Sequence, residues 1–118
     1  MATLYERLGG EESIEAVVDE FYDRVVADDR VAHFFEDTDM QKQRAHQTQF
    51  LSSVAGGPVT YTGAEMQAAH AHLDVHQEHF DAIAELLEEA LLEFDVDQED
   101  RREVLEAVAQ YEDAIVQT

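Results

Sequence analysis

Apolar side chains recur at steps of three and four residues along almost the whole chain, and this spacing limits the possible folds more than any other feature. The clearest run lies between Glu11 and about Asp28, with apolar positions at Ile14, Val17, Val18, Phe21, Tyr22, Val25 and Val26. Because a helical turn takes 3.6 residues, these side chains share one helix face. The 118 residues include a single proline, and no segment requires a strand. The sequence therefore predicts an all-α chain.

Capping residues and the same spacing place the other helices. A short first helix begins at Thr3, which stands three residues before Glu6 as in a capping box, and stops at the glycine pair 9–10. Thr38 and Gln41 repeat that spacing and predict the start of another helix. The remaining expected elements are a short helical piece ending at Phe34 and Phe35, helices over about 40–54, 65–73 and 79–94, a glycine-rich loop at 55–63, and a last helix capped by Asp97 and continuing to about Ile115.

Length and composition favour one domain over residues 1–118. Cysteine is absent, which excludes disulfides, iron–sulfur clusters and cysteine-based zinc sites. No apolar run is long enough for a signal peptide or a membrane span, so we expect a soluble, cytoplasmic protein.

The balance of charge limits the partners of the protein. Acidic residues number 28 against seven basic ones, which gives a net charge of −21, and Lys42 is the only lysine. This charge argues against binding to nucleic acid or to an anionic membrane. It also implies self-repulsion, which salt screens, so we expect a salt-rich cytoplasm and a salt-loving microbe as the source.

Polar residues interrupt the apolar stripes at a few positions, and a buried polar group costs on the order of 1–3 kcal/mol unless it is paired. On the 40–54 helix the inward face includes Gln43 and Gln47, with His46 at its edge. Tyr22 lies on the core stripe of the 11–28 helix. The plainer alternative is a stripe that stops at Phe50, with Tyr22 as an ordinary core tyrosine.

Four of the six histidines lie between residues 66 and 80: His70, His72, His76 and His79. The inward stripe of the 65–73 helix contains His70 together with apolar residues, whereas His72 and His76 should face solvent. A zinc site made by His72 and His76 is the rival interpretation, but a closed zinc site needs four ligands. No role for His79 follows from its position.

One imidazole on an apolar face, a phenol and two carboxamides on other helices, and phenylalanine walls are together what a haem pocket requires. The sequence resembles the group I truncated haemoglobins over essentially its whole length. The motifs that carry this resemblance are "TLYERLGG", "VVDEFYDRV", the Phe34-Phe35 pair, "TDMQKQRAHQTQFL", "GGPVTYTGAEM", "AHAHLDV" and "HFDAI".

The resemblance implies a two-over-two helical sandwich around haem b. By motif, His70 matches the proximal ligand of the haem iron and Tyr22 the distal tyrosine. Gln43 and Gln47 match the polar pair on the distal helix, and Phe35 matches a phenylalanine packed on the haem face.

Three further residues match positions with more variable roles. His46 matches a histidine that binds the iron as an internal sixth ligand in some cyanobacterial relatives. Lys42 and Tyr61 match contacts to the haem propionates. Some of those relatives attach haem covalently through a histidine near the C-terminus, but this sequence has none after His79, so we do not expect that bond.

The resemblance implies a monomeric haem protein that binds oxygen, nitric oxide and carbon monoxide, with nitric oxide dioxygenase activity if a separate reductase supplies electrons. The alternative is an oxygen or redox sensor, or an electron-transfer protein, with His70 and His46 on opposite sides of the iron. A haem-free helical interaction protein would leave the inward-facing Tyr22, Gln43 and Gln47 without a reason.

Overall fold

The computed structural model describes residues 3–57 and 75–116, and these residues form helices joined by turns. The elements are α1 (Leu4–Arg7), α2 (Gly10–Val26), the 3-10 helix η1 (Ala32–Phe35), α3 (Met40–Val54), α5 (Gln77–Glu93), α6 (Gln98–Ala109) and α7 (Glu112–Ile115). No strand occurs in these two ranges, and the all-α prediction is confirmed. The helix expected over 65–73 and most of the loop expected over 55–63 lie outside the described residues. None of the described helices is long and apolar enough to cross a membrane.

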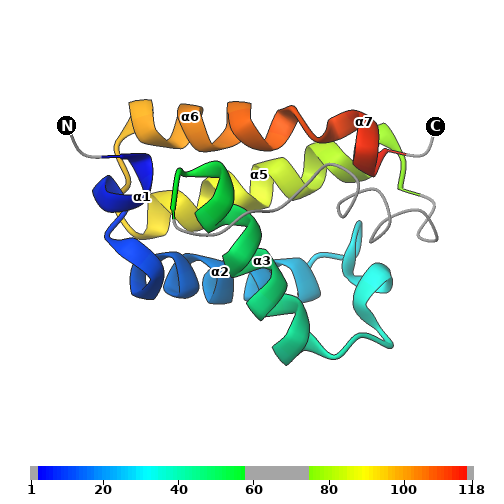
Figure 1. Ribbon diagram of the computed structural model, residues 1–118. Coiled ribbons are helices and arrows are strands. Elements are labelled where there is room, and N and C mark those ends of the chain that lie inside the picture. The colour runs from blue at the N-terminus through cyan, green and yellow to red at the C-terminus, as the bar shows by residue number, and fades with distance from the viewer. Residues whose placement is uncertain (1–2, 58–74, 117–118) are drawn as a thin grey trace.

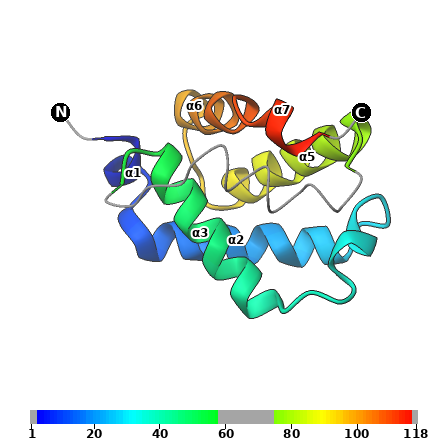
Figure 2. The ribbon, with the colours of Figure 1, turned by 45° about the vertical axis from the view of Figure 1, so that its right-hand side comes forward.

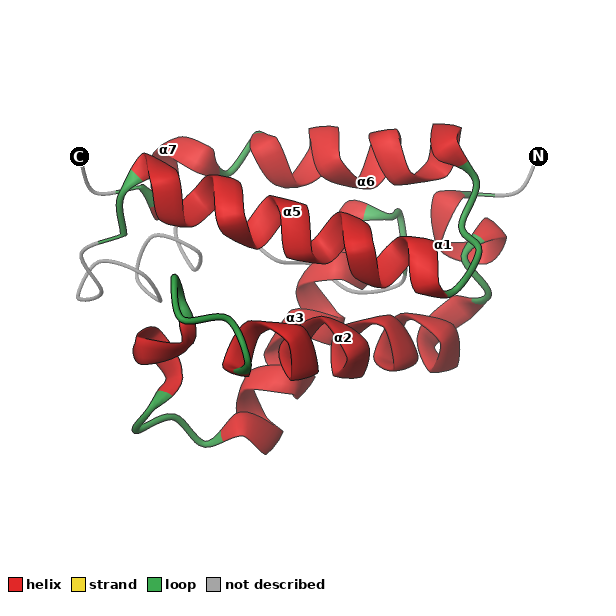
Figure 3. Cartoon of the chain, turned by 180° about the vertical axis from the view of Figure 1, so that it is seen from behind, coloured by secondary structure: helices red, strands yellow, loops and turns green. Residues whose placement is uncertain are grey.

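The four long helices form two layers. Helices α5 and α6 lie side by side in one layer, and α2 lies beneath them with α3 crossing it obliquely (Figures 1 and 2). The same two pairs are seen from behind in Figure 3. Helix α2 is central, because its most extensive contacts are with α3 and with α5. This arrangement is the two-over-two sandwich that the resemblance implies.

The core is built from the apolar faces of these helices. The side chains of Val18 and Val25 on α2 and of Leu87 and Leu91 on α5 are almost completely buried. The predicted stripe of α2 is confirmed except at its end, where Val26 is 48% exposed. It lies in the last turn of α2, next to Val25, and adjacent helix positions point about 100° apart.

Two helix starts differ in detail from the sequence-based predictions. The Thr3 cap is confirmed, since its hydroxyl accepts a hydrogen bond from the Glu6 backbone N–H at 3.2 Å. Helix α3 is capped by Asp39 and not by Thr38: the Asp39 carboxylate accepts from the backbone N–H of Gln41, at 3.1 Å, and of Lys42. A carboxylate also suits the positive end of the helix dipole.

The other differences lie in the second half of the chain. Helix α5 begins at Gln77, two residues earlier than expected. Phe94, expected on its core stripe, follows the last helical residue and is 45% exposed. Asp97 is the N-cap residue of α6, although its side chain makes no capping hydrogen bond. The last helix is interrupted at Gln110, which separates α6 from α7.

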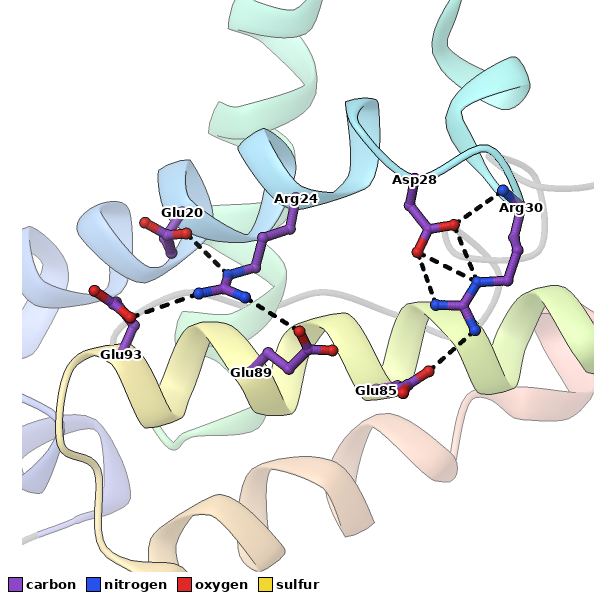
Figure 4. A network of polar contacts seen from close by, with 7 residues as sticks. All are labelled: Glu20, Arg24, Asp28, Arg30, Glu85, Glu89 and Glu93. Carbon is purple, nitrogen blue, oxygen red and sulfur yellow. Dashed lines mark hydrogen bonds and ion pairs between the residues drawn. The ribbon is translucent and has the colours of Figure 1, made fainter.

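Two arginines join α2 and the turn after it to α5 (Figure 4). Arg24 contacts Glu89 at 3.1 Å and Glu93 at 3.5 Å, both on α5. Arg30 hydrogen-bonds both carboxylate oxygens of Asp28 and reaches Glu85 on α5. Hydrogen bonding to Arg30 lowers the pKa of Asp28 to about 2, so this ion pair persists in acid until the pH approaches that value. The chain has only seven basic residues against 28 acidic ones. These two arginines offset the repulsion between acidic side chains of neighbouring helices.

Candidate functional site

The candidate site begins with a buried phenol. Tyr22 lies in the C-terminal half of α2 and is 2% exposed. Two phenylalanines pack edge-on against its ring: Phe21 with a centroid distance of 4.9 Å and Phe35 with one of 5.6 Å. Phe35 comes from η1, so the turn after α2 returns to cover the tyrosine. The ring of the phenol is thereby packed between two apolar side chains.

Gln43 provides the polar partner of this phenol. It lies in the first turn of α3, is partly buried, and donates a hydrogen bond from Nε2 to the Tyr22 hydroxyl oxygen at 3.0 Å. The inward orientation predicted for Gln43 is confirmed by this bond. Because the amide is the donor, the bond uses the phenol oxygen as an acceptor and does not use the phenol proton.

The other predicted residues of α3 divide between two faces of the helix. Gln47, one turn after Gln43, is also partly buried, because residues four apart lie on the same face. Lys42 and His46 are exposed. They form another pair four residues apart, on a face turned about 100° from the first. The structure thus brings Gln43, but not His46, into contact with the buried tyrosine.

Arg44 joins this part of α3 to α2. Its Nη1 donates to Asp19, both to the backbone oxygen at 3.1 Å and to the carboxylate at 3.0 Å, and its Nη2 donates to the Asp23 carboxylate at 3.1 Å. Its guanidinium carbon stands 5.8 Å from the centroid of the Tyr22 ring. Partial burial works to lower the pKa of Arg44, but the hydrogen bonds to Asp19 and Asp23 outweigh it and raise that pKa above its usual value. This residue was not anticipated from the sequence.

His79 has a structural role at the start of α5, which its position on the apolar stripe did not predict. Its Nδ1 accepts a hydrogen bond from the His76 backbone N–H at 3.0 Å, where α5 begins. Its ring also packs edge-on against Phe34 at a centroid distance of 4.9 Å. The spacing of three residues from His76 was the available signal, since it is that of a capping box. His76, expected at the solvent-facing surface, is partly buried, and its ring packs edge-on against that of His79 at a centroid distance of 5.5 Å.

Three predicted or rival residues, Tyr61, His70 and His72, lie outside the described residues. Within 3–57 and 75–116, no three histidine or acidic side chains come close enough together to hold a metal ion.

A haem group fits the chemistry of the side chains that the structure brings together. The phenol–amide pair would supply hydrogen bonding on one side of such a group, and Phe35 would supply a flat apolar wall. The all-α two-over-two fold and this site together define the class of protein as a haem-binding globin.

Comparison with known proteins identifies the family. The family model described as "Bacterial-like globin" matches residues 3–117. The chain is 50% identical to the group 1 truncated haemoglobin GlbN of Synechocystis sp. over 100 residues, which are 81% of each chain. It is 43% identical to GlbN of Nostoc sp. over 116 residues, which are 98% of each chain. The chain therefore belongs to the bacterial-like globin family, among the group 1 truncated haemoglobins.

Solved structures agree with this assignment. The truncated haemoglobin of Tetrahymena pyriformis in its Fe(III) form superposes with a TM-score of 0.91 and 40% identity, covering 98% of both chains. The 2/2 haemoglobin of Synechococcus sp., in the cyanomet state with covalently attached haem, gives a TM-score of 0.92 and 40% identity, over 99% of this chain and 100% of that one. The truncated globin fold is confirmed, and with it a haem protein that binds diatomic ligands, with haem b as the cofactor.

Proposed function

We propose that this globin binds oxygen tightly and oxidises nitric oxide to nitrate, working as a monomeric single domain in the cytoplasm. One oxygen molecule, one nitric oxide and one electron give one nitrate ion, so a separate reductase must return the electron at each turnover. The haem supplies the iron at which both gases react. The observation that supports this proposal is the hydrogen bond between the buried Tyr22 and the partly buried Gln43.

The residues that would hold the haem follow from their chemistry. His70 is the proposed iron ligand on one side of the haem, and the ring of Phe35 would pack on its face. Lys42, whose exposed ammonium stands at the surface of α3, would pair with a propionate, and Tyr61 would donate a hydrogen bond to one. These contacts would orient the haem with its opposite side toward Tyr22.

Tyr22 and Gln43 act together on the ligand in this proposal. A hydrogen bond to a partly charged ligand contributes roughly 1.5–3 kcal/mol, and more reliably when the donor is fixed in advance. The Gln43 amide donates to the phenol oxygen, and the phenol would donate its proton to the bound ligand. Gln47, on the same face of α3, would add a second amide. Tight binding follows, which suits a reaction of oxygen better than its transport.

Nitric oxide consumption by the oxygen-saturated protein is the experiment that tests this function. We expect one equivalent of nitric oxide to disappear rapidly and one nitrate to form in the absence of a reductant. With a reductant that regenerates the ferrous protein, consumption should continue over many turnovers. Consumption no faster than in protein-free buffer would exclude the activity.

We propose that His46 provides a second iron ligand when no external ligand is bound, as the sensor or electron-transfer alternative requires. Residues 43 and 46 are three apart on α3 and lie about 60° apart around its axis. A change in the side-chain torsions of His46, with the helix held in place, would turn its imidazole toward the side that Gln43 faces. The exposed position of His46 is the state expected when it is released.

The deoxygenated ferrous protein should accordingly give a six-coordinate, low-spin absorption spectrum. His46→Ala should convert this spectrum to a five-coordinate, high-spin one and speed ligand binding, because no internal ligand has to leave first. A low-spin spectrum that survives in the His46→Ala protein would assign the sixth ligand to another residue.

We also propose that the chain is adapted to a salt-rich cytoplasm, on the basis of its net charge of −21. Raising KCl from 0.1 to 2 M should raise the melting temperature by roughly 5–10 °C, which corresponds to about 1–2 kcal/mol for a domain of this size. The physical reason is the fall in the Debye length from about 10 Å to below about 3 Å. Replacing the exposed acids Glu15 and Glu88 by glutamine should reduce this gain. A melting temperature that is unchanged or lower at high KCl would contradict the adaptation.

A further inference from the structure

We infer that Arg44 is a positioning residue that sets the hydrogen bond between Tyr22 and Gln43 by fixing the start of α3 against α2. This inference rests on the proposed function, because it assigns to Arg44 a role in ligand binding that is exerted through the distal pair. It is independent of where the haem lies, since every contact that carries it is within the protein.

The two ends of α3 are held in different ways. The buried side chains of α3 are Thr48, Phe50, Leu51 and Ser52, all in its second half. Gln43 lies in the first half, whose one apolar contact with the core is the partly buried Met40. Because helix ends open more easily than packed segments, the first half needs another restraint to keep Gln43 at a fixed distance from Tyr22.

Arg44 supplies that restraint by contacting two carboxylates of α2 at once. Its two terminal nitrogens bind the carboxylates of Asp19 and Asp23, which are four residues apart and so one turn apart on α2. One of these nitrogens also binds the backbone oxygen of Asp19. A rigid, planar guanidinium that spans one turn of a helix fixes both the distance and the rotation between two helices, which the single ammonium of a lysine cannot do.

The position of this contact along α2 links it to the phenol. Tyr22 lies between Asp19 and Asp23 in the sequence, and the guanidinium carbon of Arg44 stands 5.8 Å from the centre of its ring. Gln43, the neighbour of Arg44 on α3, reaches the hydroxyl of the same tyrosine at 3.0 Å. Two consecutive residues of α3 therefore act on one tyrosine, one on its ring and the other on its oxygen.

Arg24, which lies on α2, is a matched comparison for Arg44. It is also an arginine that joins α2 to another helix, and its side chain is 31% exposed against 27% for Arg44. Its partners on the other helix are Glu89 and Glu93 of α5. Exposed ion pairs stabilise a fold only weakly, so the two arginines should contribute similarly to stability. They should differ in their effect on the ligand.

The experiment compares Arg44→Met, Arg44→Lys and Arg24→Met in the haem-loaded protein. The readouts are the oxygen dissociation rate constant, the carbon monoxide stretching frequency in the infrared, and the melting temperature. Arg44→Met should speed oxygen release by roughly threefold to tenfold, and its carbon monoxide band should broaden or split, because the donor is no longer held in one position. Arg44→Lys should resemble Arg44→Met, since it cannot span both carboxylates. Arg24→Met should leave the oxygen dissociation rate constant and the carbon monoxide band unchanged, and its melting temperature should be similar to that of Arg44→Met.

A double variant tests whether Arg44 acts through the tyrosine. In a Tyr22→Phe background, Arg44→Met should cause no further change in oxygen release. A further acceleration in that background would overturn the inference, as would equal effects of Arg44→Met and Arg24→Met on release and on the carbon monoxide band.

The same set of proteins separates this inference from the proposed function. If Tyr22→Phe speeds release and Arg44→Met does not, the positioning role is wrong and the distal donor stands. If Tyr22→Phe itself leaves release unchanged, the distal donor is wrong, and the positioning role falls with it. Arg44→Lys keeps a cation at the position and serves as the test if Arg44→Met yields too little folded protein.

Discussion

Replacing Tyr22 with phenylalanine should speed oxygen release by roughly ten- to a hundredfold. The change removes one hydroxyl from a buried ring and leaves the packing against Phe21 and Phe35 in place. The lost hydrogen bond is worth roughly 1.5–3 kcal/mol, and each 1.4 kcal/mol is about a factor of ten. Displacement of oxygen by excess carbon monoxide in a stopped-flow instrument measures the rate directly.

A second tyrosine provides the control for this change. Tyr111, which follows α6, packs edge-on against Phe50 at a centroid distance of 5.1 Å and is partly buried. Tyr111→Phe removes the same atom far along the chain and should leave oxygen release unchanged. The distal role of Tyr22 is refuted if its phenylalanine variant releases oxygen no faster than the Tyr111→Phe protein.

Replacing His70 with glycine should weaken haem binding by more than about a hundredfold. Changes to residues that merely support a metal ligand already cost 10- to 100-fold in affinity, so loss of the ligand itself should cost more. Purified His70→Gly protein should show little or no Soret absorbance. Added imidazole, which replaces the missing ring without being attached to the chain, should restore much of it.

His72→Gly is the matched control, because it removes a histidine two residues away in the same motif. It should bind haem as the parent does. Normal haem binding and an unchanged ferrous spectrum in the His70→Gly protein would show that another histidine is the proximal ligand. Combining His70→Gly with His46→Ala reveals whether His46 retains part of the haem.

The helical fold could be predicted from the sequence because periodicity reports directly on burial. The stripe of α2 is an example: Val18, Phe21, Tyr22 and Val25 are buried as their spacing indicates. The ends of the helices were predicted less accurately than their buried faces. Thr38 and Asp39 are both good N-caps, for example, and only the backbone geometry selects between them. The break between α6 and α7 at Gln110 could not be predicted, because no proline or glycine stands there.

The candidate site could be predicted only in part. Gln43 was recognisable because a glutamine on an apolar stripe needs a partner, and Tyr22 was the phenol available on another stripe. Arg44 gave no such signal, since in a chain with 28 acidic residues every arginine has carboxylates within a few residues. Which of them it binds depends on the crossing of α2 and α3, and this is a property of the folded chain.

Lys42 makes this protein unusually simple to label. It is the only lysine in the sequence, it is exposed, and it directly precedes Gln43 on α3. Amine-directed reagents therefore have one side chain to modify, next to the proposed ligand pocket. Acetylation followed by peptide mass spectrometry reads out this lysine amine separately from any α-amine, so protection by added haem would report a propionate contact at single-residue resolution. A fluorophore attached to Lys42 would be quenched as haem enters. Its fluorescence would therefore measure cofactor uptake directly.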